Sequence, residues 1–337
     1  MRLSVSIRKN LIQTNTGWIT NRFKIKSRRN VLIFEEIIAN YVKLCENSGH
    51  EAEIAEIGQK WMNLVMDRMV PNIFKRTPIF FLNNIMKKVW INLGLLSDLH
   101  AIKKNNKILI ETREETVTRL IGKNECLTGF YAGILNVLFS SQVFCSKKIQ
   151  TRKSCRYFYE LLDKKFSPLP SKKKEQYDRL NLSSGSKGIT LKSVLESGIF
   201  QLKGDSNRIL FRGKDLWYVE NTGFHILGNR KILLDKVPKI SYDFFRQIII
   251  KKSSCDKKLN MIKTLLHSMG WGVVNIINKK NRILFEISNL PHGMQIEEDN
   301  WDFLAEVILG YLWLIDKKFR INDKKCKHGK LVITYFN

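Results

Sequence analysis

The chain has 337 residues, 44% of them hydrophobic, so it is long enough to bury a sizeable core, and its length favours two domains over one. Lysine and arginine number 58 against 31 acidic residues, which gives a formal net charge of +27. No apolar run reaches the roughly 18 residues of a membrane-spanning helix. The six cysteines form no C-x-x-C pair, so they indicate neither a disulfide framework nor a zinc ribbon, and we expect a cytoplasmic protein.

The positive charge leaves two interpretations open. A basic surface attracts nucleic acid or anionic membrane, with an affinity that falls as salt rises. However, the excess is spread over the whole chain, lysine outnumbers arginine, and isoleucine and asparagine are abundant, which an AT-rich genome also produces. Residues 1–30 form a basic arm that superficially resembles a transit peptide, although they are equally typical of a short strand leading into the first helix.

Apolar spacing predicts a mainly helical first half that closes with strands. A helical hairpin is expected over 40–70 with a break at 47–50, and a further helix over 77–93. The other elements expected in this half are a strand at 107–112, a buried helix at 125–139, and a hairpin of strands at 142–144 and 154–159.

Residues 164–189 contain lysine runs, two prolines and a glycine-serine stretch, which predict a linker between an N-terminal domain, 1–163, and a C-terminal domain, 190–337. The second half is predicted to be richer in strands. Its expected elements are strands at 198–202, 208–212, 216–219 and 231–234, helices at 241–251 and 257–269, strands at 272–277 and 281–288, a helix at 300–315, and strands at 319–321 and 330–336.

The two halves repeat one order: a helical pair, a strand, a buried helix with a glycine-aromatic step, and a terminal hairpin. The matching pieces are Gly129-Phe130-Tyr131 with Gly310-Tyr311-Leu312, and residues 155–159 with residues 332–336. This repetition predicts an α+β fold of two related modules, each with helices packed on one face of an antiparallel sheet.

Five segments of the second half occur in an informative order. They are N-R-I-L-F-R-G-K-D-L-W-Y-V (207–219), H-S-M-G-W-G (267–272), I-L-F-E-I-S-N (283–289), L-G-Y-L (309–312) and K-K-C-K-H-G-K (324–330). In this order they resemble a 4-vinyl reductase domain, a small-molecule-binding module whose superfamily includes haem-NO-binding-associated domains and trafficking-particle (TRAPP) core subunits. The first half is similar more loosely, through 127–133 and 153–158.

The resemblance implies an apolar pocket between the helices and the sheet of each module. The residues that match are Gly129, Phe130, Tyr131, Gly133, Gly310 and Tyr311. Gly129 and Gly133 lie on one helical face, where their lack of a side chain admits either a ligand or the backbone of another helix. Because Leu314 answers Gly133 in the second half, we expect an open pocket in the first module. The resemblance also implies self-association, as a homodimer or by pairing of the two repeats.

A zinc site or other cofactor is not expected. In the family the C-terminal hairpin often carries two cysteines eight residues apart around a glycine. Here the position eight residues after Cys326 is Thr334, and the position eight residues before Cys155 is Lys147. Each repeat therefore has only one of the two cysteines.

The sequence contains no G-x-S-x-G, Walker-type loop, H-E-x-x-H or catalytic carboxylate cluster, and its histidines at 267, 292 and 328 are scattered. The expected function is therefore non-enzymatic: binding of an apolar small molecule, or a sensory or scaffold role. The alternatives are a polyanion-binding protein, acting on nucleic acid or an anionic membrane, and a trafficking-type assembly subunit.

Overall fold

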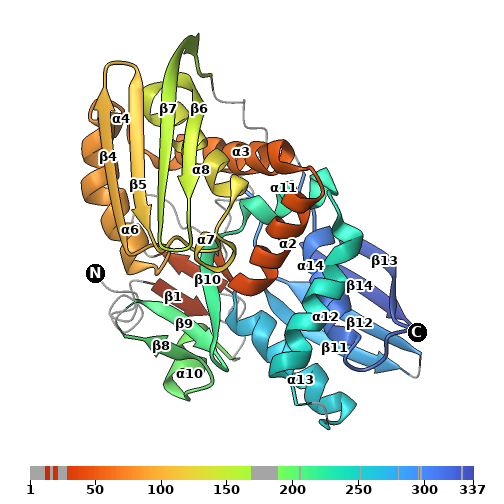
Figure 1. Ribbon diagram of the computed structural model, residues 1–337. Helices are drawn as coiled ribbons and strands as arrows, with labels where there is room; N and C mark the ends of the chain where they lie inside the picture. The colour runs from red at the N-terminus through yellow and green to blue at the C-terminus, as the bar shows by residue number, and fades with distance from the viewer. Residues whose placement is uncertain are drawn as a thin grey trace.

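The computed structural model describes residues 12–15, 18–21, 29–167 and 189–337, except positions 205, 251, 280, 295, 297 and 328. Most of the basic arm, most of the linker and His328 therefore lie outside the described residues. Helices and three antiparallel sheets form a mixed α+β fold (Figure 1). No helix in the described ranges combines the length and the apolar character needed to cross a membrane.

One six-stranded sheet combines strands from both sides of the linker. Its order is β1 (Ile12–Asn15), β2 (Trp18–Asn21), β3 (Arg29–Phe34), β10 (Lys214–Glu220), β9 (Arg208–Phe211) and β8 (Gln201–Lys203). β3 and β10 pair antiparallel, with Leu32 opposite Tyr218. The indole of Trp271 donates a 2.9 Å hydrogen bond to the Leu32 carbonyl. Described residues on both sides of the linker thus share one sheet and one buried core.

The chain between β3 and the linker forms the first helix-and-sheet module. Its helices and strands are α2 (Glu35–Asn47), α3 (Glu51–Met69), α4 (Asn72–Lys75), α5 (Pro78–Phe80), the π-helix η1 (Phe81–Met86), α6 (Lys87–Asn92), β4 (Asp98–Lys104), β5 (Lys107–Arg113), α7 (Thr118–Ile121), α8 (Glu125–Phe139), β6 (Ser141–Gln150) and β7 (Ser154–Lys165). The sheet order is β4-β5-β7-β6. The helix expected over 77–93 is present as α5, the π-helix η1 and α6 in succession. The strand β4 was not predicted.

The second module begins after the short helix α10 (Leu191–Glu196) and the strands β8 to β10. Its elements are α11 (Thr222–Arg230), the 3₁₀ turn η3 (Leu234–Lys236), α12 (Val237–Ile248), α13 (Cys255–Ser268), β11 (Val273–Lys279), β12 (Arg282–Ser288), α14 (Asp302–Leu312), β13 (Arg320–Lys327) and β14 (Lys330–Phe336). The strand expected at 231–234 is wrong, because Lys231 and Leu233 both have positive φ and cannot continue an extended chain.

The four-stranded sheets of the two modules have the same topology. The second sheet has the order β11-β12-β14-β13, which repeats β4-β5-β7-β6 strand for strand. In Figure 1 the two sheets lie at opposite ends, and most of the helices lie between them. The strand registers place Tyr159 at the position of Tyr335. Residues 155–159 therefore correspond to 331–335, one residue away from the expected match.

The buried helices α8 and α14 also correspond. Tyr159 donates a 2.6 Å hydrogen bond from its hydroxyl to the Thr128 carbonyl, and Tyr335 donates one of 3.0 Å to the Ala305 carbonyl. Counting along each helix from these carbonyls pairs Gly133 with Gly310. The expected match of Gly129 with Gly310 is wrong by one helical turn, an error that keeps the residue on the same face and so escapes a pattern comparison.

Candidate functional site

A cavity of about 470 Å³ lies in the first module, between α3, the segment 70–96, α8 and β10. Its wall is mainly apolar. The apolar and aromatic residues on the wall are Trp61, Met62, Val65, Met66, Met69, Val70, Pro71, Phe74, Phe81, Ile85, Met86, Val89, Trp90, Leu93, Leu95, Leu96, Leu127, Phe130, Tyr131, Trp217, Tyr218, Val219 and Met294. The polar residues on the wall are Asn30, Arg68, Glu115, Thr116 and Glu220. The second half therefore completes the cavity of the first, through β10 and Met294.

The candidate residues of the first module lie in two different environments. Phe130 and Tyr131 lie on the cavity wall. Gly129 and Gly133 do not, because they face α3: a Cβ at Gly129 would lie 1.7 Å from the Ala55 carbonyl oxygen. Of the two explanations open for these glycines, close packing of one helix on another is the one that the geometry provides.

The candidates of the second module have the same packing role. A Cβ at Gly310 would lie 2.3 Å from the Pro238 carbonyl oxygen in α12, and one at Gly133 would lie 2.4 Å from that of Gln59 in α3. Tyr311 donates a 2.8 Å hydrogen bond from its hydroxyl to the Lys258 carbonyl in α13. Gly133, Gly310 and Tyr311 therefore hold helices together and do not line the large cavity.

The equivalent cavity of the second module has a volume of only about 20 Å³. Its wall includes Val307 and Ile308, which correspond to Phe130 and Tyr131, and it is completed by β3 as the first is completed by β10. Phe34, the last residue of β3, lies with its ring centroid 4.6 Å from that of Phe244. The rings of Phe34, Phe245 and Phe303 lie on the wall of this small cavity.

Glu115 is a polar residue on the wall of the large cavity. It is 2% exposed and accepts hydrogen bonds from four hydroxyl groups. The donors are Thr112, Thr118, Tyr131 and Tyr157. Burial, and then the charge of Glu115, raises the pKa of both tyrosines well above the ordinary value, so both phenols stay protonated and donate.

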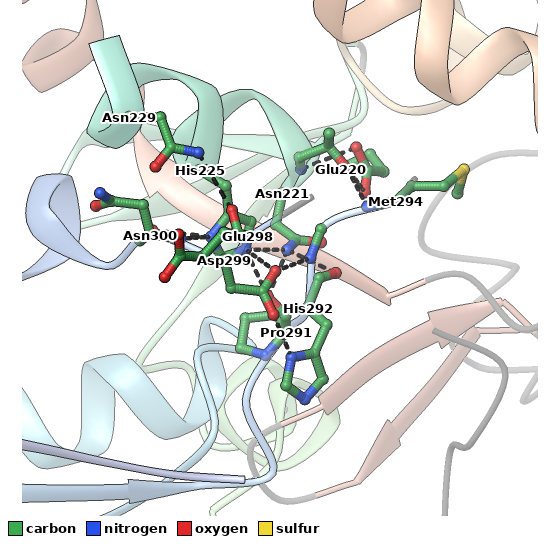
Figure 2. A network of polar contacts seen from close by, with 12 residues as sticks. Glu220, Asn221, His225, Asn229, Pro291, His292, Met294, Glu298, Asp299 and Asn300 are labelled. Atoms are coloured by element: carbon green, nitrogen blue, oxygen red, sulfur yellow. Dashed lines mark hydrogen bonds and ion pairs between the residues drawn. The ribbon is translucent and has the colours of Figure 1, made fainter. Parts of the chain in front are cut away.

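Glu220, the last residue of β10, is a second carboxylate on this wall. It accepts a 3.0 Å hydrogen bond from the Trp61 indole and bonds of 3.0 Å and 2.7 Å from the backbone N–H and the hydroxyl of Thr222. The same Thr222 oxygen accepts a 2.6 Å bond from the backbone N–H of Met294 (Figure 2). Through Thr222, this carboxylate holds a wall residue from a distant loop against the cavity.

The loop that carries Met294 is anchored by a polar network around His225 (Figure 2). The Nδ1 of His225 accepts a 3.1 Å bond from the backbone N–H of Asn300, and its Nε2 lies 2.9 Å from the Pro291 carbonyl. Asp299 lies 2.6 Å from the Nδ1 of His292. Burial lowers the pKa of His225, which favours the neutral ring that can accept and donate in this way.

Of the histidines noted in the sequence, His267 and His292 lie within the described residues and contact different groups. His267 accepts a 2.6 Å bond from the backbone N–H of Val274, at a distance in the chain from the His292 loop. Cys155 is buried in β7, where burial raises its pKa to about 12, and Cys326 is exposed on β13. Among the described residues no three His, Cys, Asp or Glu side chains are grouped to hold a metal ion.

The main polar residues of the site escaped the sequence analysis. Glu115 and Thr116 follow a predicted strand, but nothing marks them in the chain as buried. Trp217 belongs to the segment 207–219 that was compared with a family hairpin, and Glu220 directly follows that segment. The contribution of both residues to the first module depends on the β3–β10 pairing. Such long-range pairing leaves no local pattern.

Comparisons of the chain with protein-family models, with curated proteins and with solved structures found no match. The resemblance to 4-vinyl reductase domains therefore depends on the sequence segments alone and stays a hypothesis.

Proposed function

We propose that this protein is a non-enzymatic module that binds a small, mainly apolar molecule in the cavity of its first half, as a carrier, sensor or ligand-stabilised scaffold. The observation that carries the proposal is the pair of unequal cavities. Two modules of the same topology enclose about 470 Å³ and about 20 Å³ at equivalent places. The fold can therefore fill this space with side chains, and it does so in one module only.

The size and lining of the large cavity support this function. Ligand pockets commonly have volumes of about 300–1,000 Å³, apolar walls and a few placed polar groups. Three tryptophans, Trp61, Trp90 and Trp217, and a run of methionines line this one. Tryptophan offers a large flat surface, and methionine adapts to irregular shapes.

The wall includes a residue that is also exposed at the surface. Val89 in α6 lines the cavity and is 40% exposed, so this helix lies between the cavity and the solvent. The π-helical turn η1 precedes α6 and contributes Phe81 and Met86 to the wall. Single π-turns within helices occur frequently at functional sites.

The test is native mass spectrometry of protein purified without added ligand, followed by organic extraction. We expect a stoichiometric apolar adduct in the wild type. Val65→Trp places a larger side chain in the cavity and should abolish the adduct while the protein stays folded. Ile73→Trp, at a position that is 67% exposed and off the wall, is the matched control and should keep it.

An adduct that survives Val65→Trp would contradict binding in this cavity. A protein of bare mass that instead retains nucleic acid or anionic lipid at low salt, and loses it at high salt, would favour the polyanion-binding alternative.

A further inference from the structure

Asn30, Thr116 and Trp217 belong to the wall of the large cavity, and each has a buried polar atom for which no hydrogen-bond partner lies in the described part of the chain. These atoms are the side-chain nitrogen of Asn30, the hydroxyl of Thr116 and the indole nitrogen of Trp217. The three residues are 5%, 4% and 8% exposed, so water does not reach them freely. A buried polar group without a partner destabilises the protein, which favours a ligand that supplies one.

The hydrogen-bonding capacity of these atoms determines which group the ligand must provide. An amide NH₂ and an indole N–H are donors only, and a hydroxyl can donate. Asn30 lies at the start of β3 and Trp217 on the neighbouring strand β10, so both donors come from the central sheet. The ligand therefore has to present a hydrogen-bond acceptor to this wall.

The two carboxylate acceptors on the wall are already engaged. Glu115 receives four hydroxyl groups, and Glu220 receives the Trp61 indole and two bonds from Thr222. A ligand that donates, such as an alcohol or an amine, would find few free lone pairs there. The two carboxylates also outnumber Arg68, the one cationic side chain of this wall within the described residues, so the wall disfavours an anion.

We infer that the ligand is an uncharged, largely apolar molecule with a carbonyl-type oxygen, such as a ketone, aldehyde, ester or amide, which accepts from one or two of the donors of Trp217, Asn30 and Thr116. The inference rests on the proposed function and adds the chemical class of the ligand. Apolar surface provides the binding free energy, and the carbonyl oxygen provides the selectivity.

Three naphthalenes of similar size separate the possibilities. 2-Acetylnaphthalene carries the carbonyl, 2-ethylnaphthalene lacks any acceptor, and 2-naphthoate is the anion. Binding to the full-length protein is measured by equilibrium dialysis with chromatographic quantification. We expect 2-acetylnaphthalene to bind about tenfold more tightly than 2-ethylnaphthalene, which is the effect of one or two hydrogen bonds, and 2-naphthoate to bind most weakly.

Two variants assign the preference to the wall. Trp217→Phe removes the indole N–H, and Thr116→Val removes the hydroxyl at nearly constant shape. Each should reduce the preference for 2-acetylnaphthalene over 2-ethylnaphthalene, taken as the ratio of the two affinities, to about threefold or less. Trp313→Phe is the control, because its indole donates to the Phe319 carbonyl away from the cavity, and it should keep the full preference.

Each other result has a defined meaning. Equal affinity for the acetyl and ethyl compounds, both lost in Val65→Trp, would overturn the carbonyl inference and leave the apolar cavity as a binding site. Tightest binding of 2-naphthoate would overturn it in favour of an anionic ligand. A lack of binding by all three compounds would contradict both the inference and the proposed function.

Discussion

Thr116 and Thr118 lie two residues apart beside the cavity in opposite situations. The hydroxyl of Thr118 donates a 3.1 Å hydrogen bond to Glu115, whereas that of Thr116 has no partner within the residues described. Both side chains are at least 96% buried, since they are 4% and 0% exposed. A buried hydroxyl that is hydrogen-bonded stabilises the fold, and one that is not costs free energy.

We expect Thr118→Val to lower the free energy of unfolding by about 1–2 kcal/mol, because it removes a donor from a buried carboxylate. Thr116→Val should change it by less than about 0.5 kcal/mol or raise it, because valine removes an unpartnered polar atom. Urea denaturation of the two variants and the wild type measures both. A cost for Thr116→Val equal to that for Thr118→Val would mean that the Thr116 hydroxyl is bonded in the ligand-free protein.

At the scale of an element, the loop between β12 and α14 reaches from the second module to the cavity of the first. It is held by His225 in α11, which accepts from the Asn300 N–H only when its Nδ1 is unprotonated. Burial lowers the pKa of this histidine, so the unfolded chain binds the proton more readily than the folded one. The stability that His225 contributes is therefore present above the unfolded pKa, about 6.5, and is lost as pH falls through the lowered folded pKa.

Between pH 6.5 and pH 5 we expect the free energy of unfolding to fall as the pH falls. His225 contributes to the slope of this free energy against pH, by up to about one proton taken up on unfolding. His225→Gln should reduce that slope and lower stability at pH 8, where the network is intact in the wild type. Urea titrations at several pH values give both quantities. His100→Gln, in an exposed position on β4, is the control and should leave the slope unchanged; an equal slope in His225→Gln would show that this histidine does not titrate as stated.

At the scale of the whole molecule, the two modules are joined through the β3–β10 pair. Leu32 donates from its N–H to the Met269 carbonyl at 2.7 Å and accepts from the Trp271 indole, so β3 is built into the second module. Conversely, β10 and Met294 complete the cavity of the first. Each half buries apolar surface that belongs to the other.

Because of this exchange, neither half should fold alone. We expect fragments 1–178 and 179–337 to be insoluble or unfolded when produced separately, and to form a soluble one-to-one complex when produced together. Size-exclusion chromatography with circular dichroism checks this outcome. A stable, monomeric fragment 179–337 with a cooperative unfolding transition would show that the second module does not require β3.

Much of the architecture could be predicted from local patterns in the sequence. Apolar periodicity and the N-S-G-H break located α2 and α3, the apolar composition of 125–139 located α8, and alternation located β5, β7, β12 and β14. These elements depend on interactions between near neighbours, which the sequence displays directly. The mixed α+β class and the repeated order of elements followed from the same patterns.

The sequence by itself determined the α+β class, most of the helices and strands, and the similarity of the two halves, because each follows from short-range periodicity. Only the tertiary structure decided that β3 and β10 pair across the linker, that Gly133 rather than Gly129 corresponds to Gly310, and that Glu115, Thr116 and Trp217 meet around one cavity. The physical reason is that a cavity and its buried polar atoms depend on side-chain volume and on contacts between residues about a hundred positions apart, which no local pattern records.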